Sequence, residues 1–223
     1  MKAIISDIHG NYVALKAVLK SIDELDVEEI FCLGDIVGYY SQVNECCDEL
    51  RKRRVKCILG NHDWYMVYGM QCERSKSVND CLVYQRKVLT EENRAWLRSL
   101  PVTIIRDDFC MVHGGWKNPI DEYLEPSNDY FKSFPDGVYF SGHTHKAIVQ
   151  TIRDGLLYCN PGSVGQPRDW NSCASYALFD GTQCRVVRIP YDYELVGKFM
   201  EKAGFSSYYY GCLYDGSRNL HGL

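Results

Sequence analysis

Four segments of the chain share one pattern: an apolar run ends in a glycine-containing turn that carries Asp, Asn or His. They span residues 6–11, 33–38, 59–63 and 141–145. In the first segment, Asp7 and His9 stand two residues apart behind a short apolar run. A carboxylate and an imidazole at this spacing can reach one metal ion, and the following Gly10 allows a tight turn. The recurrence predicts one site that is assembled from several strand ends.

The spacing of these segments predicts how they come together. Asp7 and Asp35 lie 28 residues apart, and Asp35 and Asn61 lie 26 apart. Strands are expected at 3–5, 28–33 and 55–59, with helices at 12–22, capped by Asn11, and at 43–50, capped by Ser41. Alternation of this kind predicts parallel βαβ units. Open α/β sheets place their sites beyond the carboxyl ends of such strands.

Beyond residue 63 the pattern changes twice. Residues 64–100 are helical in pattern, with a second helix that opens at Thr90, Glu91 and Glu92 and stops before Pro101. Strand-like runs then follow at 102–105, 109–113, 138–141, 147–152, 156–159, 175–179 and 185–189. Asp-Gly pairs at 154–155 and 180–181 predict hairpin turns. The second half is therefore expected to form a largely antiparallel sheet, followed by a helix at 192–203 with Gly204 as its C-cap.

Length and composition limit the classes to which the chain can belong. The chain has 223 residues, a net charge of −4 and 24% charged residues, and no basic stripe that would predict nucleic-acid binding. We expect one domain over 1–223, with a C-terminal helix and a Tyr-rich tail from about 191. The tail could pack on the body, form an oligomer contact or hang loose, and no function is assigned to it.

The amino terminus and the cysteines predict a cytoplasmic protein. The apolar run after Lys2 is too short for a signal peptide, and no run is long enough to span a bilayer. The eleven cysteines are odd in number, lack C-x-x-C spacing and fall partly inside predicted strands. Buried reduced thiols have this distribution, so no disulfide framework is expected.

Five of the six histidines lie in predicted turns at strand ends. They are His9, His62, His113, His143 and His145. Any one of them alone is best interpreted as an ordinary surface or core histidine. Five together in the same kind of turn indicate a shared site.

At this point the sequence resembles the calcineurin-like metallophosphoesterases. Their ordered pattern is D-x-H, G-D-x-x-G, G-N-H-(D/E), a later His and G-H-x-H, and here it occupies residues 7–9, 34–38, 60–63, 113 and 142–145. Residues 160–168 are similar to the small, mainly prokaryotic, phosphodiesterase-like branch. The resemblance implies an α/β fold, a four-layer αββα sandwich of two mixed sheets with helices outside. It also implies a binuclear metal centre at the edge of the sandwich.

The resemblance implies a ligand set for two divalent metal ions. Asp35 bridges them; Asp7, His9 and His145 complete one site, and Asn61, His113 and His143 complete the other. Mixed imidazole, carboxylate and amide donors suit Mn, Fe, Co, Ni or Zn. Two such ions roughly 3.5–4 Å apart can clamp a phosphate and activate a water as nucleophile.

Three further residues are assigned to catalysis and substrate binding. By resemblance, His62 lies beside the substrate and either protonates the leaving oxygen or stabilises charge on the phosphoryl group. The alternative is that it only positions Asn61. Asp63 is predicted to orient His62, or else to act as a carboxylate at a helix amino terminus. Arg168 is a candidate ligand for a phosphate oxygen, with an ordinary surface arginine as the equal alternative.

Two aromatic features concern the shape of the substrate pocket. Trp116 and Tyr123 lie in the loop after His113; either ring could stack on a nucleobase, and core packing is the favoured alternative. Residues 39–41 depart from the family pattern, in which smaller residues or Pro follow the glycine. This departure concerns the pocket and leaves the metal ligands unaffected.

The resemblance to the phosphodiesterase-like branch implies a phosphodiesterase that acts on a small phosphate ester, with nucleotides among the candidates. The alternatives are a phosphomonoesterase, including a serine/threonine protein phosphatase, and a non-catalytic scaffold of the same fold. A scaffold typically lacks a ligand or the leaving-group histidine, and here every position is filled. We expect no membrane partner, and the oligomeric state stays open.

Overall fold

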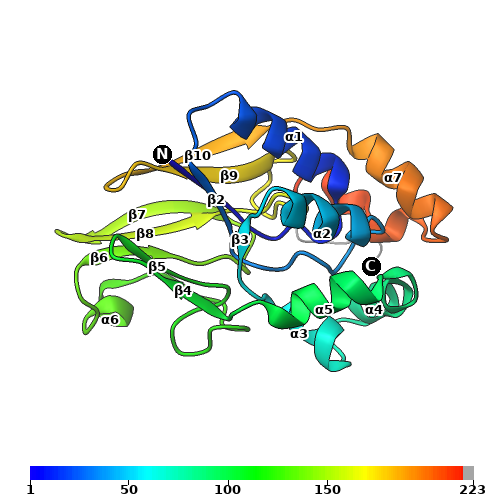
Figure 1. Cartoon of the computed structure of the whole chain (residues 1–223), viewed down its shortest axis with the longest axis horizontal. Helices are drawn as coiled ribbons and strands as arrows, with labels where there is room; N and C mark the ends of the chain where they lie inside the picture. Colours follow the sequence, from blue (N-terminus) through cyan, green and yellow to red (C-terminus); the bar gives the residue numbers. More distant parts are fainter. Residues whose placement is uncertain (218–223) are drawn as a thin grey trace.

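Two five-stranded sheets pack face to face in the computed structural model, which describes residues 1–217 (Figure 1). The first sheet has the order β10-β9-β1-β2-β3 and the second β4-β5-β6-β8-β7. The first comprises β1 (Lys2–Ile5), β2 (Glu29–Cys32), β3 (Lys56–Cys57), β9 (Ala174–Phe179) and β10 (Cys184–Ile189). The second comprises β4 (Thr103–Ile105), β5 (Phe109–Val112), β6 (Gly137–Phe140), β7 (Ala147–Arg153) and β8 (Leu156–Pro161).

The helices lie on the outer faces and at one end of the sandwich. They are α1 (Tyr12–Asp23), α2 (Val43–Lys52), α3 (Asn61–Tyr68), α4 (Lys76–Val88), α5 (Glu91–Ser99), α6 (Asn128–Phe131) and α7 (Tyr193–Lys202). Figure 1 shows α1 and α2 beside the first sheet, α6 below the second, and α7 at the right, where it packs on α1. The predicted αββα order is therefore confirmed, although the outer layer on the second sheet is thin because α6 has four residues.

The parallel βαβ prediction is correct for the first sheet. β1 pairs parallel with β2, and β2 pairs parallel with β3, so that Ile5, Cys32 and Cys57 lie side by side. The carboxyl ends of these three strands therefore meet at one edge. β9 and β10 complete this sheet in antiparallel orientation, and the predicted turn at 180–181 connects them.

The expectation of one largely antiparallel sheet in the second half is correct only in part, because β9 and β10 join the first sheet and the second sheet is mixed. β5, β6 and β8 run parallel, while β4 and β7 are antiparallel edge strands. The hairpin at 154–155 forms as predicted, between β7 and β8. Apolar runs predict strands but carry no information on their direction, and the long segment between β5 and β6 provides the crossover that parallel pairing needs. A second set of carboxyl ends thereby reaches the same edge as the first.

Four phenylalanines fill the space between the sheets. Phe31 meets Phe109 edge to face with ring centroids 5.1 Å apart, Phe109 meets Phe140 at 5.6 Å, and Phe140 meets Phe179 at 5.4 Å. Phe31 and Phe179 come from the first sheet, and Phe109 and Phe140 from the second. Each such pair contributes about 0.5–1.5 kcal/mol beyond the area it buries. This cluster fixes the spacing of the two sheets.

Helix boundaries agree with the sequence at some positions and differ at others. The Asn11 side chain caps α1 by accepting from the Ala14 amide at 3.0 Å, and Thr90 caps α5 in the same way. Ser41 is not a cap; the N-cap of α2 is Gln42, whose side chain makes no capping bond. The region 64–100 contains three helices, and the first begins earlier, at Asn61. The C-cap of α7 is Ala203, followed by Gly204 at φ +89°.

The Tyr-rich segment packs on the body over its described part, up to residue 217. Tyr210 is buried and donates to Glu201 at 2.6 Å, and Tyr209 donates to Asp80 at 3.0 Å. Residues 218–223 of this segment lie outside the described part of the chain. All eleven cysteines are free, as expected. Among residues 1–217, no helix combines the length and apolar character needed to cross a membrane.

Loss of one ring from the phenylalanine cluster should loosen the packing of the two sheets. Phe140 is fully buried, so we expect Phe140→Ala to lower the free energy of unfolding by about 3–5 kcal/mol, through lost burial and a cavity. Ile105→Ala is the control, because Ile105 is 72% exposed, and it should cost less than about 0.5 kcal/mol. Urea unfolding followed by circular dichroism measures both. Equal losses would contradict the proposed importance of the cluster.

Candidate metal centre

The seven predicted metal ligands lie at one edge of the sandwich, just beyond the carboxyl ends of five strands. β1 leads to Asp7 and His9, β2 to Asp35, β3 to Asn61, β5 to His113, and β6 to His143 and His145. All seven side chains are buried. The structure thus brings together residues that are up to 138 positions apart in sequence.

The ligand atoms form two groups that share Asp35. One group is Asp7, His9, Asp35 and His145, and the other is Asp35, His113 and His143; within each group the candidate ligand atoms lie within 4.8 Å of one another. Asn61 joins the second group, because its Oδ1 lies 3.1 Å from His113 Nε2. This is the arrangement expected of two neighbouring metal ions with one bridging carboxylate.

Backbone carbonyls orient three of the imidazoles. The Nδ1 atoms lie 3.1 Å from the Val37 carbonyl for His9, 2.8 Å from the Leu33 carbonyl for His113, and 2.6 Å from the Gln166 carbonyl for His145. Because a carbonyl can only accept, Nδ1 carries the proton in each ring. The Nε2 lone pair of a neutral ring then points into the group of ligands, which is how protein histidines are prepared for metals.

The donor set fits divalent cations because it has too few protons of its own. His9 Nε2 and His145 Nε2 lie 3.0 Å apart, although both are acceptors when Nδ1 is protonated. Asp7 Oδ1 is buried beside them and makes no hydrogen bond within the described part of the chain. Facing lone pairs and an unpaired buried carboxylate oxygen are unfavourable unless a cation lies between them.

The pKa values show which side chains of the site carry charge when no metal is bound. Burial lowers the pKa of His9 and of His145, so both rings are neutral. Burial alone would raise the pKa of Asp35, but the nearby imidazoles of His113 and His62 outweigh it and lower that pKa. Burial likewise opposes charge on His113, yet Asp35 raises the pKa of His113 to about 10. A metal that binds His113 must therefore displace a proton.

Five of the predicted ligands adopt a left-handed backbone conformation. Only seven non-glycine residues in the described chain have positive φ, and five are Asp7, His9, Asp35, His143 and His145, with φ between 52° and 64°. This conformation costs roughly 1–2 kcal/mol at each such residue. Strain of this kind is retained where the surrounding structure holds a functional group in place.

Two motif glycines are required by close approach. A Cβ at Gly60 would overlap the Asp35 carboxylate, and a Cβ at Gly38, where φ is +144°, would overlap the rings of His9 and His62. The glycines in G-N-H and G-D-x-x-G thus leave room for the side chains that converge here.

The structure separates the roles of His62 and Asp63. The His62 amide donates to Asp35 Oδ1 at 2.8 Å, while its ring lines a cavity of about 220 Å³ together with Asn61 and Arg168. Its Nδ1 has no hydrogen-bond partner among residues 1–217, and burial lowers the pKa of His62 to about 4.

Asp63 accepts from the backbone amides of Ile36, Val37 and Gly60 at 2.9–3.0 Å. No hydrogen bond within residues 1–217 joins Asp63 to the His62 ring. This geometry differs from the orienting role and matches the alternative, a carboxylate at the start of α3. Asp63 fixes the turn that carries Asp35.

Tyr39 and Gln166 hold Arg168 at the cavity, and the sequence did not identify either as functional. Arg168 donates to the Tyr39 hydroxyl at 2.8 Å and to Gln166 Oε1 at 2.6 Å. The Tyr39 ring also lies 4.7 Å from His9 and 5.0 Å from His62. The residue at which the sequence departs from the family pattern, Tyr39, therefore lines the pocket and supports the arginine. The signal for Gln166 was its position inside the 160–168 motif.

The two aromatic residues of the loop after His113 have different surroundings. Trp116 packs against Phe131, Phe134 and Tyr139, as expected for a core residue. Tyr123 is 43% exposed and lies on the His143 ring with centroids 4.1 Å apart. Tyr123 therefore stands at the rim of the site.

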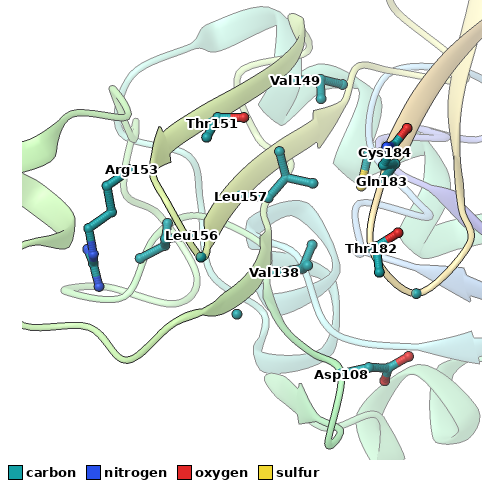
Figure 2. A pocket seen from close by; sticks show the side chains of 13 residues that line it. Asp108, Val138, Val149, Thr151, Arg153, Leu156, Leu157, Thr182, Gln183 and Cys184 are labelled. Carbon is teal, nitrogen blue, oxygen red and sulfur yellow. The ribbon is translucent and has the colours of Figure 1, made fainter.

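A more voluminous cavity, of about 580 Å³, lies at the other end of the strands (Figure 2). Val138, Leu156 and Leu157 at the start of β6 and β8 line it, with Arg153 and the turn around Thr182. It shares no lining residue with the metal-ligand groups or with the cavity of His62. Size alone therefore does not mark the functional site.

The similarity of this chain to known proteins agrees with this geometry. The model of the calcineurin-like phosphoesterase superfamily domain matches residues 1–183. The chain belongs to this superfamily. A metallophosphoesterase from Sphaerobacter thermophilus has a similar structure, with a TM-score of 0.82 and 32% identity, covering 96% of this chain and 98% of that one.

Two relatives of this calcineurin-like phosphoesterase differ in the share of its chain that they match. An uncharacterised protein of Methanocaldococcus jannaschii is 38% identical over 86% of this chain and 88% of its own length. A symmetrical bis(5′-nucleosyl)-tetraphosphatase of Actinobacillus pleuropneumoniae is 28% identical over 50% of this chain and 44% of its own length.

Asp35 belongs to both ligand groups, so its substitution should affect both metals of this phosphoesterase. Asp35→Asn removes a negative charge that faces both groups, so we expect loss of both metals and a fall in turnover of more than about 100-fold. His145→Ala affects one group and should retain one metal per chain. Elemental analysis and phosphoester turnover, measured on the same preparations, compare the two. Two retained metals and near-normal turnover in Asp35→Asn would show that Asp35 does not bridge.

Proposed function

We propose that the protein is a dinuclear metal-dependent phosphodiesterase. The observation that carries this proposal is a pair of cavities that meet at Arg168 and Tyr123. One, of about 220 Å³, contains His62 and Asn61; the other, of about 410 Å³, contains Leu124, Pro126 and Ile148. A phosphodiester carries two organic ester groups on its phosphorus and needs room for both, whereas a monoester carries one and needs room on one side.

Two divalent ions, chosen from Mn, Fe, Ni, Co and Zn, would supply the charge that activates a water and neutralises the phosphate. Asp7, His9, Asp35 and His145 would hold one, and Asp35, Asn61, His113 and His143 the other. The donor chemistry and the shortage of protons between the imidazoles support this assignment.

The remaining residues act on the substrate or support those that do. The ring of His62 lines the cavity, where it can act on a leaving oxygen or a phosphoryl oxygen. Arg168 offers its guanidinium to a phosphate oxygen, while Tyr39 holds that guanidinium. Asp63 acts through the Asp35 turn rather than on the substrate.

A nucleotide substrate is supported by the named activity of the Actinobacillus relative, although that match covers half of this chain. The alternatives are a phosphomonoesterase, including a serine/threonine protein phosphatase, and a scaffold without activity. The complete ligand set speaks against a scaffold.

We infer one domain over 1–223, because β10 and α7 lie beyond the family match yet pair with β9 and pack on α1. Eleven free thiols support a reducing compartment such as the cytoplasm.

Metal content and two model substrates test the proposed activity. We expect about two metals per chain and a higher kcat/KM on bis-p-nitrophenyl phosphate than on p-nitrophenyl phosphate, because the first occupies both cavities. Chelation should abolish turnover, and added Mn or Ni should restore it. Preference for the monoester would overturn the diesterase proposal alone. Absence of metal and of turnover, even with added Mn or Ni, would overturn the enzyme proposal.

His62→Ala should keep both metals, because the His62 ring is not part of either ligand group. If His62 protonates the leaving oxygen, its loss should cost about 10²–10⁴ on alkyl or nucleoside esters and far less on p-nitrophenyl esters. A steeper plot of log rate against leaving-group pKa in the variant supports this role. An unchanged slope with both metals retained would assign His62 to charge stabilisation. Lost metal would assign it to positioning Asn61.

A further inference from the structure

Two arginines lie in the cavity next to the metal-ligand groups, which we call the polar pocket. Its lining includes His62, Arg74, Arg168, Ser75 and Ser77. Arg168 is half-buried, and its side chain donates hydrogen bonds to two neutral side chains, Tyr39 and Gln166. No carboxylate of residues 1–217 forms an ion pair with it. A partly desolvated guanidinium without a counter-charge favours an anion in the pocket.

Arg74 lines the same pocket. Asp121 accepts from its guanidinium, which also lies over the Tyr123 ring, 5.4 Å from the centroid. These two contacts hold the guanidinium in place. The fork of an arginine can bind a second anion while it keeps one carboxylate, because it has five N–H donors.

The amino terminus of α4 opens onto the polar pocket. α4 has 13 residues, Ser75 is its N-cap, and its first turn contains no acidic side chain. The first amides of a helix have no intrahelical acceptor, and the helix dipole adds positive potential there. Ser77 also lines the pocket, and its hydroxyl lies 3.0 Å from that of Ser75. This end of α4 is suited to a phosphate group.

The His62 ring forms a further wall of the polar pocket. Its Nδ1, unpartnered within the described chain, is fully buried and lies against Gly38, so it does not face a group bound in the pocket. The two guanidinium groups and the amino terminus of α4 therefore favour an anion at one place.

The volume of the polar pocket limits what that anion can be. A volume of about 220 Å³ is enough for a phosphate group, and the lining is mainly polar. The neighbouring cavity of about 410 Å³ has an apolar wall of Leu124, Pro126 and Ile148 that suits the organic part of a substrate. The two cavities thus differ in the chemistry that they accept.

We propose that the substrate carries a second phosphate, joined through a bridging oxygen to the reacting one, and that Arg74, Arg168 and the start of α4 bind it. This assignment rests on the proposed hydrolysis at the metal-ligand groups. A water oxygen forms a bond to the reacting phosphorus, and the bond from that phosphorus to the bridging oxygen breaks. The electron pair stays on the bridging oxygen, which leaves as part of the second phosphate, and the proton lost by the water passes to that phosphate or to solvent.

Paired substrates separate this inference from the proposed function. Diadenosine tetraphosphate has neighbouring phosphates, whereas the p-nitrophenyl ester of thymidine 5′-monophosphate has a nucleoside and one phosphorus. We expect Arg74→Gln to lower the ratio of kcat/KM for the first to that for the second by about 10- to 100-fold, the effect of one lost charge-assisted contact. The metal content of each variant is measured in parallel.

Lys76→Gln is the matched control. It removes one positive charge from the first turn of α4, but Lys76 lies outside the polar pocket and pairs with Asp80. The ratio should not change in this variant. The double variant Arg74→Gln/Asp121→Asn keeps the local charge balance and should show the same fall in ratio as Arg74→Gln.

Three results would overturn the inference while leaving the proposed function intact. The first is a wild-type enzyme that cleaves the thymidine ester but not diadenosine tetraphosphate. The second is an unchanged ratio in Arg74→Gln with both metals retained. The third is a fall of the kcat/KM ratio in Arg74→Gln that accompanies metal loss and is absent from the double variant. The effect would then come from the unpaired Asp121 carboxylate near His143. Failure to cleave the thymidine ester and bis-p-nitrophenyl phosphate, with two metals bound, would instead overturn the diesterase proposal.

Discussion

The position of the Asp35 carboxylate is the constraint on which the rest of the site depends. Its Oδ1 accepts from the His62 amide, and its Oδ2 lies 3.6 Å from His9 Nε2 and 3.4 Å from His113 Nε2. His9 follows a strand of the first sheet and His113 a strand of the second. One carboxylate can therefore face both imidazoles only if the two sheets are held at a fixed spacing. The phenylalanine cluster between the sheets provides this spacing.

The local structure around Asp35 is unfavourable by itself and is stabilised by its neighbours. Asp35 has a positive φ, yet Asp63 binds the amides of the turn that follows, and Gly60 leaves room for the carboxylate. Residues that violate backbone preferences are expected where function requires a set geometry. The left-handed conformation of Asp7, His9, His143 and His145 follows the same principle. The protein thus concentrates strain at the edge where its ligands converge.

Prediction of the fold was good for elements with a strong local signal. The strands, the hairpin turns at 154–155 and 180–181, and the caps Asn11 and Thr90 were all recognisable, because each rests on neighbouring residues. Strand direction in the second sheet was correct for the edge strands β4 and β7 and wrong for the pairs of β6 with β5 and β8, since parallel and antiparallel pairing bury the same apolar runs. The cap at Ser41 was also wrong, because the chain enters α2 one residue later, at Gln42.

The sequence by itself determined which candidate metal ligands come together, because each of these residues stands in a short motif beside a strand that carries it to the edge. It could not determine the pocket around them. Arg74, Tyr39 and Gln166 belong to three separate segments and meet only when α4, the Gly38 turn and the turn after β8 pack together. Asp63 illustrates the same limit: its neighbour in sequence is His62, but its hydrogen-bond partners are amides that the fold brings to it. Motifs record local geometry, whereas contacts between segments are decided by tertiary packing.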